Sequence, residues 1–300
     1  IRPVTPPPRR PAARRGRYLG RSRVWEIVVV LVALLVAAPI LVVLASVFTP
    51  TGEIWSHLAA TVLPEYVRNS LALMAGVGVG TLVIGVGTAW LVTMTEFPGR
   101  RVAEWALLLP MAIPAYILAY AYTDFLQFSG PLQTALREAT GWGARDYWFP
   151  NVRSLGGAIA MLTLALYPYV YLLTRTAFLE QSASILEAAR SLGRGAWKSF
   201  FLVSLPLARP AIAAGVALAL METLADFGTV EFFGVITFTT GIYRTWFGLG
   251  EREAAAQLAA LLMVFVLVLI LLERGLGRRP DAQPLTSRFR PLARYRLRGG

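Results

Sequence analysis

The sequence of 300 residues contains no cysteine and a single histidine, His57. Without cysteine the chain can form no disulfide, no thiolate metal site and no cysteine nucleophile. One histidine leaves almost nothing for a zinc site built on histidine or for Ser-His-Asp chemistry. The sequence also has no G-x-x-x-x-G-K-[ST] phosphate-binding loop, so we do not expect the chain to hydrolyse ATP. These absences argue against an enzyme and predict no cofactor bound by this chain.

Charged residues are also scarce. They make up 15% of the chain, whereas 56% of the residues are hydrophobic. A soluble domain needs more polar surface than this, so the chain is predicted to be embedded in a lipid bilayer. The net charge of +12 does not indicate nucleic-acid binding, because the basic residues lie at the two ends and in loops rather than along one soluble face.

Six apolar stretches are long enough, or nearly so, to cross the hydrocarbon core, which takes about 20 helical residues. They are residues 27–48, 70–95, 105–123, 154–174, 210–227 and 254–272. Each is expected to be helical, because lipid offers no partner to an unpaired backbone amide or carbonyl. The predicted fold is therefore an all-α integral membrane protein with six transmembrane helices.

Glycine and proline within these stretches indicate how they pack. The second stretch is predicted to lie inside the bundle, because its glycines let neighbouring helices approach closely; they are Gly76, Gly78, Gly80, Gly85 and Gly87. Pro110, Pro114 and Pro168 are predicted to kink their helices. Gly228, Gly234 and Gly241 are expected to shape a re-entrant or loop segment between the fifth and sixth spans.

Arginine and lysine are distributed unevenly between the two sides. With the N-terminus inside, 23 of them lie on the cytoplasmic side and six outside, so both termini and the loops 95–104 and 175–209 are predicted to be cytoplasmic. The expected organisation is a basic tail (1–26), a six-span region (27–272) and a basic tail or linker to a second half (273–300). The outer loop 124–153 then carries an aromatic interface belt of Trp142, Tyr147, Trp148 and Phe149.

The cytoplasmic segment 182–206 has the signals of a short helix. Ser184 and Glu187 fit the S-x-x-E capping box, and Gly193 is placed to end the helix as a left-handed C-cap. Arg190 and Arg194 lie one turn apart on one face. A short helix in a loop is only marginally stable by itself, so this helix is expected to dock onto a partner.

The pattern Glu187-Ala188-Ala189, then Gly193, then Leu205-Pro206 resembles the EAA loop of binding-protein-dependent ABC importer permeases. The resemblance implies that this segment couples the permease to an ATP-binding cassette subunit, which holds ATP and Mg²⁺. It also implies a periplasmic substrate-binding protein, a second permease half or copy, and a bacterial inner membrane. Arg190 and Arg194 are candidates for pairing with an acidic partner surface, whereas the capping box explains Glu187 without any partner.

Other segments are similar to the iron(III) importer permeases: 109–120, 167–171, 222–230 and 237–246. This resemblance implies ferric iron as cargo. Permeases of that group typically carry two six-span halves, and this chain, with one EAA loop, is similar to the N-terminal half. We expect either a chain that continues after Gly300 or pairing with a second copy or separate partner.

Three carboxylates are candidates for the substrate pathway. Glu222 and Asp226 lie one helical turn apart near the outer end of the fifth span, and Glu231 follows. Ionisable groups at membrane depth normally face a polar cavity or a partner, and carboxylate oxygens suit a hard cation such as ferric iron. Alternatively, Glu222 caps a helix break or pairs with a basic group, and the other two lie at the interface. No metal site is certain.

Other functions remain open at this point. An ion-coupled secondary transporter would also use buried carboxylates and broken helices, but it needs no dock for an ATPase. Within the importer class, the coupling loop does not distinguish iron from sulfate, phosphonate, thiamine or polyamine.

Overall fold

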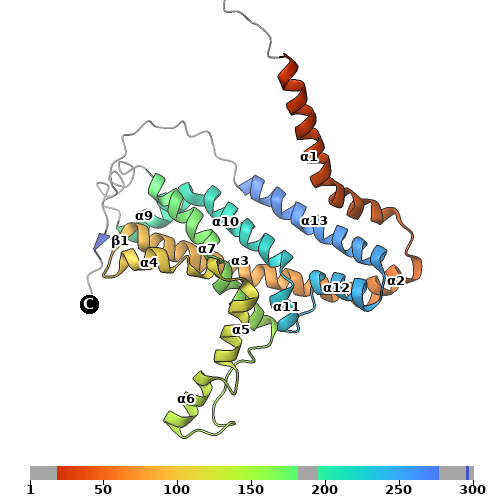
Figure 1. Ribbon diagram of the computed structural model, residues 1–300. Helices are drawn as coiled ribbons and strands as arrows, with labels where there is room; N and C mark the ends of the chain where they lie inside the picture. Colours follow the sequence, from red (N-terminus) through yellow and green to blue (C-terminus); the bar gives the residue numbers. More distant parts are fainter. Residues whose placement is uncertain (1–18, 182–194, 277–294, 297–300) are drawn as a thin grey trace, which may run out of the picture.

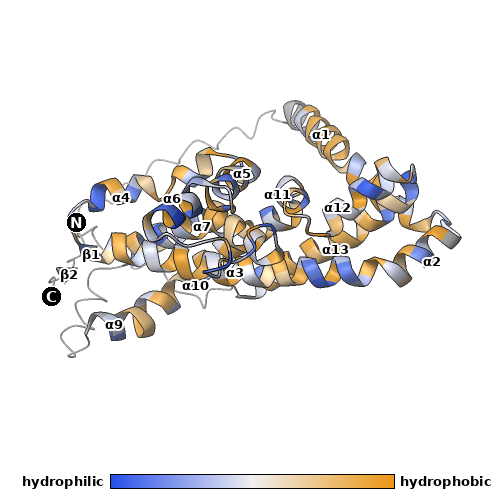
Figure 2. Ribbon diagram, turned by 90° about the horizontal axis from the view of Figure 1, so that it is seen from below, coloured by the Kyte–Doolittle hydropathy of each residue, from blue (hydrophilic) through white to orange (hydrophobic). Residues whose placement is uncertain are grey.

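The computed structural model describes residues 19–181, 195–276 and 295–296. Five long helices are apolar enough to cross a membrane, which confirms five of the six predicted spans. They are α1 (Leu19–Ala45), α3 (Leu63–Met94), α7 (Leu155–Glu180), α10 (Leu205–Ala225) and α13 (Arg252–Leu276). Hydrophobic residues predominate along α1, α3, α10 and α13 in Figure 2, as expected for surfaces that face lipid or one another.

Shorter elements connect these helices. On the N-terminal side they are η1 (Ser46–Phe48), α2 (Gly52–Thr61), β1 (Thr95–Glu96), α4 (Arg100–Ala106), η2 (Leu109–Ala112), α5 (Ala115–Leu126) and α6 (Pro131–Thr140). On the C-terminal side they are α9 (Ala196–Ser199), the π-helical turn η3 (Phe200–Ser204), α11 (Gly228–Phe232), α12 (Phe238–Tyr243), the π-helical turn η4 (Arg244–Gly248) and β2 (Tyr295–Arg296). β1 and β2 pair in parallel over two residues.

The centre of the bundle is the contact of α3, α7 and α10, which lie side by side (Figure 1). Val170 of α7 is fully buried between two glycines. A Cβ atom on Gly85 of α3 would lie 2.6 Å from the Val170 Cβ, and one on Gly215 of α10 would lie 2.8 Å from the Val170 Cα. Only glycine at both positions lets the three backbones approach this closely.

The other glycines of α3 show the same principle. A Cβ on Gly76 would lie 2.7 Å from Ile159, and one on Gly80 would lie 2.6 Å from Thr163. Gly78 faces Leu220 of α10, whereas Gly87 has nothing within 4 Å. Four of the five glycines therefore lie in helix contacts, as predicted, but the span is not wholly interior, since Val79 and Val83 on its other face are 63% and 65% exposed.

The third predicted span, 105–123, is wrong as a continuous helix. The helix is interrupted between Ala112 and Ala115, and the axes of the helical segments before and after this interruption differ by 103°. Pro110 lies in the first turn of η2 and Pro114 is the N-cap of α5. Proline lacks an amide hydrogen and forces the residue before it out of the helical region, as Ile113 shows with φ −122° and ψ 129°. These two prolines break the helix, whereas Pro168 lies inside the continuous α7.

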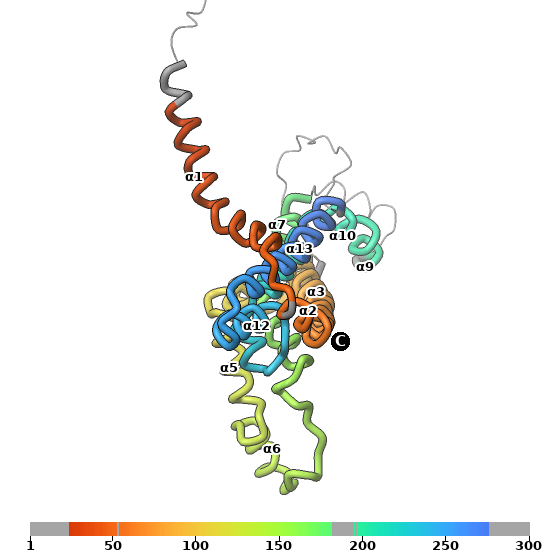
Figure 3. Tube along the Cα trace, turned by 90° about the vertical axis from the view of Figure 1, so that its right-hand side faces the viewer, coloured from red at the N-terminus to blue at the C-terminus, as the bar shows by residue number. Residues whose placement is uncertain are grey.

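Because of this bend, α5 and α6 project from the bundle. Helix α1 extends from the bundle in another direction (Figure 3). The predicted outer loop is therefore partly helical, since α6 occupies 131–140. The glycine-containing segment between the fifth and sixth spans holds two short helices, α11 and α12.

Gln257 of α13 holds the start of the α1–α2 connection in place. Its amide nitrogen donates to the carbonyl oxygens of Ser46 (3.0 Å) and Thr49 (2.8 Å), and its Oε1 accepts from the Thr51 hydroxyl (2.7 Å). These bonds satisfy backbone groups at the end of a span, where helical partners have run out.

Gln257→Leu is expected to lower the free energy of unfolding by about 1–3 kcal/mol, because it removes three hydrogen bonds and takes the side-chain donor from the Thr49 carbonyl. The Ser46 carbonyl still accepts from the Thr49 amide. Thermal unfolding of the purified protein in detergent measures the change. The matched control is Gln127→Leu, since the Gln127 amide makes one exposed hydrogen bond, to Asp124. Equal melting temperatures for both variants would contradict the prediction.

Candidate functional site

The predicted coupling segment lies only partly within the described residues. Glu187, Ala188, Ala189, Arg190, Gly193 and Arg194 fall in 182–194, outside them. Leu205 and Pro206 form the first turn of α10, and Leu205 packs beside the buried cluster that contains Trp90, Phe178 and Phe200. These two residues are therefore part of a spanning helix and partly buried, not exposed on a loop.

The two predicted cytoplasmic loops meet at one end of the bundle. Glu104 of α4 pairs with Arg100 (2.9 Å) and with Arg175 of α7 (3.7 Å), and the Tyr171 hydroxyl donates to the Glu104 carbonyl (3.2 Å). Arg100 also donates to the carbonyl of Val92 at the end of α3 (2.9 Å). The i,i+4 spacing of Arg100 and Glu104 is visible in the sequence, but the contribution of Arg175 from 71 residues away is not.

Asp226 has a structural role at the opposite end of α10. One of its carboxylate oxygens accepts from the Thr229 hydroxyl (2.9 Å), and the other accepts from the Val230 amide (3.0 Å). Both donors belong to α11, whose first-turn amides have no partner within the helix. The Asp226 carbonyl also accepts from the Thr239 hydroxyl of α12 (2.7 Å). Asp226 thereby fixes α11 and α12 against the end of α10.

Glu231 of α11 pairs with Arg244, at 3.3 Å between Oε2 and the guanidinium. Both side chains are 40–50% exposed, so solvent screens this pair and it contributes at most about 1 kcal/mol. Arg244, the first residue of η4, is a site residue that the sequence alone did not indicate, because the pairing spans 13 positions with a turn between them.

Glu222 differs from the other two carboxylates. It lies in α10, three residues before the end of the helix, and its side chain is exposed. Among the described residues it makes no hydrogen bond or ion pair. Leu218, Met221 and Ala225 are exposed on the same face of the helix, at the i, i+3, i+4 and i+7 spacing. A carboxylate on a spanning helix is costly to expose to lipid.

The three carboxylates do not form a metal-binding cluster. Within the described part of the chain, no group of three His, Cys, Asp or Glu side chains could hold a metal ion. Asp226 and Glu231 are occupied by α11 and Arg244, so Glu222 is the predicted pathway residue that the structure leaves available.

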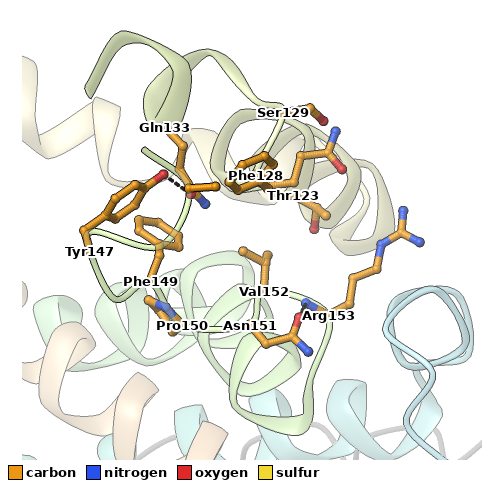
Figure 4. Close-up of a pocket in the computed structure, with 12 residues that line it drawn as sticks. Thr123, Phe128, Ser129, Gln133, Tyr147, Phe149, Pro150, Asn151, Val152 and Arg153 are labelled. Carbon is orange, nitrogen blue, oxygen red and sulfur yellow. Dashed lines mark hydrogen bonds between the residues drawn. The ribbon is translucent and has the colours of Figure 1, made fainter. Parts of the chain in front are cut away.

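A cavity of about 430 Å³ lies on the predicted outer side, between α5, α6 and the segment before α7 (Figure 4). Gln133 of α6 accepts from the Tyr147 hydroxyl (2.7 Å) and donates to the Leu126 carbonyl (2.7 Å). Arg137 donates to the Tyr147 hydroxyl and to the Phe128 carbonyl, each at 3.0 Å. These bonds hold the projecting α5–α6 segment as one unit.

The spanning helices pack around a glycine-lined centre, which is the architecture of a multi-pass membrane protein. The chain belongs to the family described as the inner membrane component of binding-protein-dependent transport systems, which matches residues 81–281. Its fold is similar to that of a bacterial ABC transporter that imports the acidic polysaccharide alginate, with a TM-score of 0.68 and 16% identity over 88% of this chain and 99% of the other.

Curated relatives carry different cargo names. The chain is 26% identical over 208 residues to the Fe(3+)-transport system permease protein FbpB 2 of Haemophilus influenzae, across 69% of this chain and 37% of that protein. It is 27% identical over 204 residues to the molybdenum transport system permease protein ModB of Escherichia coli K12 (66% and 86%). It is 29% identical over 206 residues to the sulfate transport system permease protein CysT of the same strain (66% and 72%). The match thus spans little more than a third of the iron permease.

Family membership confirms the predicted class of protein. The chain is a multi-pass inner-membrane component of a binding-protein-dependent transport system. It does not decide the cargo, because the relatives are named for iron(III), molybdenum and sulfate at similar identities.

Proposed function

We propose that this chain is the permease component of an importer for ferric iron delivered by a periplasmic binding protein. The observation that carries the proposal is Glu222, an exposed carboxylate without a hydrogen bond or ion pair among the described residues, on a spanning helix. A negative group on the pathway attracts a hard cation and repels an oxyanion.

A single carboxylate at Glu222 also suits a pathway through which the cargo passes better than a site that retains the cargo. A conduit must bind its cargo weakly enough to release it. A single carboxylate meets this requirement better than a cluster of several ligands. In the proposed arrangement, the exposed face of α10 lines the pathway and meets the equivalent face of a second permease half or copy.

The proposal also assigns the 182–206 segment to coupling with the ATP-binding subunit. ATP-driven closure of that subunit moves the segment, and the spans re-orient about the pathway. Such a segment drives the change only if the partner binds it differently in the two states.

The test is uptake by the complete transporter, reconstituted in vesicles with its ATP-binding subunit and binding protein. Radioactive ferric iron, molybdate and sulfate are offered in parallel, with and without ATP. We expect ATP-dependent uptake of iron only. ATP-dependent uptake of molybdate or sulfate in place of iron would leave the importer class intact and overturn the cargo proposal, whereas failure of the ATP-binding subunit to copurify would overturn the coupling proposal.

A further inference from the structure

A hydrogen bond joins Gln181, just before the segment 182–194, to Ser204, ten residues after it. Gln181 is the C-cap of α7. Its side-chain amide nitrogen, Nε2, donates to the backbone carbonyl oxygen of Ser204 at 2.9 Å, across 23 residues of sequence. Ser204 is the last residue of η3 and is almost fully buried. The end of α7 and the start of α10 are therefore joined by a direct hydrogen bond.

The returning helix changes its winding at this point. Residues Phe200–Ser204 form a π-helical turn, in which the Leu205 amide donates to the Phe200 carbonyl five residues earlier. Pro206 follows and has no amide hydrogen with which to continue α-helical bonding. π-helical turns within helices are frequent at functional sites, and they shift the direction of the side chains before them relative to those after them. This turn separates α9 from α10 while keeping one helical run, Trp197–Ala225.

Aromatic contacts join the same point to a third helix. The rings of Trp90 in α3 and Trp197 in α9 stack, with centroids 5.1 Å apart and planes at 23°. Phe200 meets the edge of Trp90 at 5.3 Å and that of Phe178 in α7 at 6.4 Å. Phe178 is fully buried, whereas Trp197 is 65% exposed. Trp197 therefore contributes little to the core, but it connects the returning segment to α3.

We infer that this group, Gln181 with Ser204 and Trp197 with Trp90, is the clasp through which segment 182–194 moves the spans. The inference rests on the coupling role proposed above. A loop whose ends move independently absorbs a displacement in its own backbone. Here the flanking helices are joined, α7 to the start of α10 by the Gln181–Ser204 bond and α9 to α3 by the Trp197–Trp90 stack. A displacement therefore passes on to α3, α7 and α10, which pack around Val170. Gln181 and Trp197 are positioning residues, because they act through the helices and do not contact the cargo.

The test compares the number of ATP molecules hydrolysed per cargo ion imported by the complete transporter in vesicles, with loaded binding protein present. Gln181→Met removes the hydrogen bond and keeps the size of the side chain. Trp197→Leu removes the stack at an exposed position, where folding is not at risk, and Trp197→Tyr restores an aromatic ring. The matched controls are Gln127→Met and Trp142→Leu, since Trp142 is also exposed and stacks on Tyr147 at 6.0 Å, far from the clasp in sequence.

We expect Gln181→Met and Trp197→Leu to retain the ATP-binding subunit and its basal hydrolysis. The ATP consumed per ion should rise about fivefold or more, the lower end of typical coupling effects between sites. Trp197→Tyr and both controls should match the wild type. Wild-type ratios in both clasp variants would overturn the inference while the proposed function stands. Loss of the ATP-binding subunit from these variants alone would also overturn it, since the residues would then belong to the dock. Loss from the wild type would overturn the proposed function itself.

Discussion

Gly85→Val is expected to destabilise the protein by about 1–3 kcal/mol or more, the range typical of overpacked cores. The added Cβ would lie 2.6 Å from the Val170 Cβ and 3.0 Å from the backbone nitrogen of Tyr171. Neither atom is the end of a flexible side chain, so α3 and α7 must separate. Because Val170 also contacts Gly215 of α10, the separation disturbs all three central helices. Thermal unfolding in detergent and the amount of folded protein in the membrane measure the effect.

Gly87→Val is the matched control, two residues along the same helix. A Cβ on Gly87 meets nothing within 4 Å, and replacing a helical glycine removes some unfavourable backbone entropy. This variant should therefore equal or slightly exceed the wild type in stability. Equal losses in both variants would show that the cost comes from valine in α3 and not from the contact with Val170.

Glu222→Gln is expected to reduce ATP-dependent uptake of ferric iron about tenfold or more, since it removes the negative charge that attracts a cationic cargo in the proposed pathway. The sign of the effect reports the charge of the cargo. A cationic cargo loses an attraction, whereas an oxyanion loses a repulsion and its uptake should stay unchanged or rise. Initial uptake rates at equal membrane levels of permease measure the difference.

Glu231→Gln serves as the control for this experiment. Its carboxylate already pairs with Arg244 at an exposed position, so the expected change in uptake is less than about fivefold. Unchanged iron uptake in Glu222→Gln would remove the observation on which the cargo proposal rests. An effect of Glu231→Gln as large as that of Glu222→Gln would place the selective charge at the mouth instead of in the span.

Much of the fold followed from local features of the sequence. Five spans are long apolar runs, and their number and approximate positions depend only on that length and composition. The close packing of the second span followed from its glycines, although which helix each glycine meets did not. The third span misled because hydropathy over 105–123 is high enough for a helix, while Pro110 and Pro114 stop one from forming.

For the candidate pathway residues too, the sequence predicted part of the arrangement and the structure showed the rest. Spacing placed Glu222, Asp226 and Glu231 near one another, but hydrogen bonding separated their roles. Asp226 is occupied by the amide and hydroxyl groups of α11, and Glu231 by Arg244. No periodicity in the sequence could have shown this, because the partners depend on where the chain turns after α10.

By itself the sequence determined that this protein is embedded in a membrane, because apolar length is a property of short segments that need no partner. Its resemblance to the importer permeases predicted the class of protein, which the family match confirms. The tertiary structure alone decided that Val170 lies between two glycines and that Gln181 bonds to Ser204. These features depend on contacts between residues far apart in the chain. Their positions are fixed only when the helices pack and unpaired backbone groups find partners within the bundle.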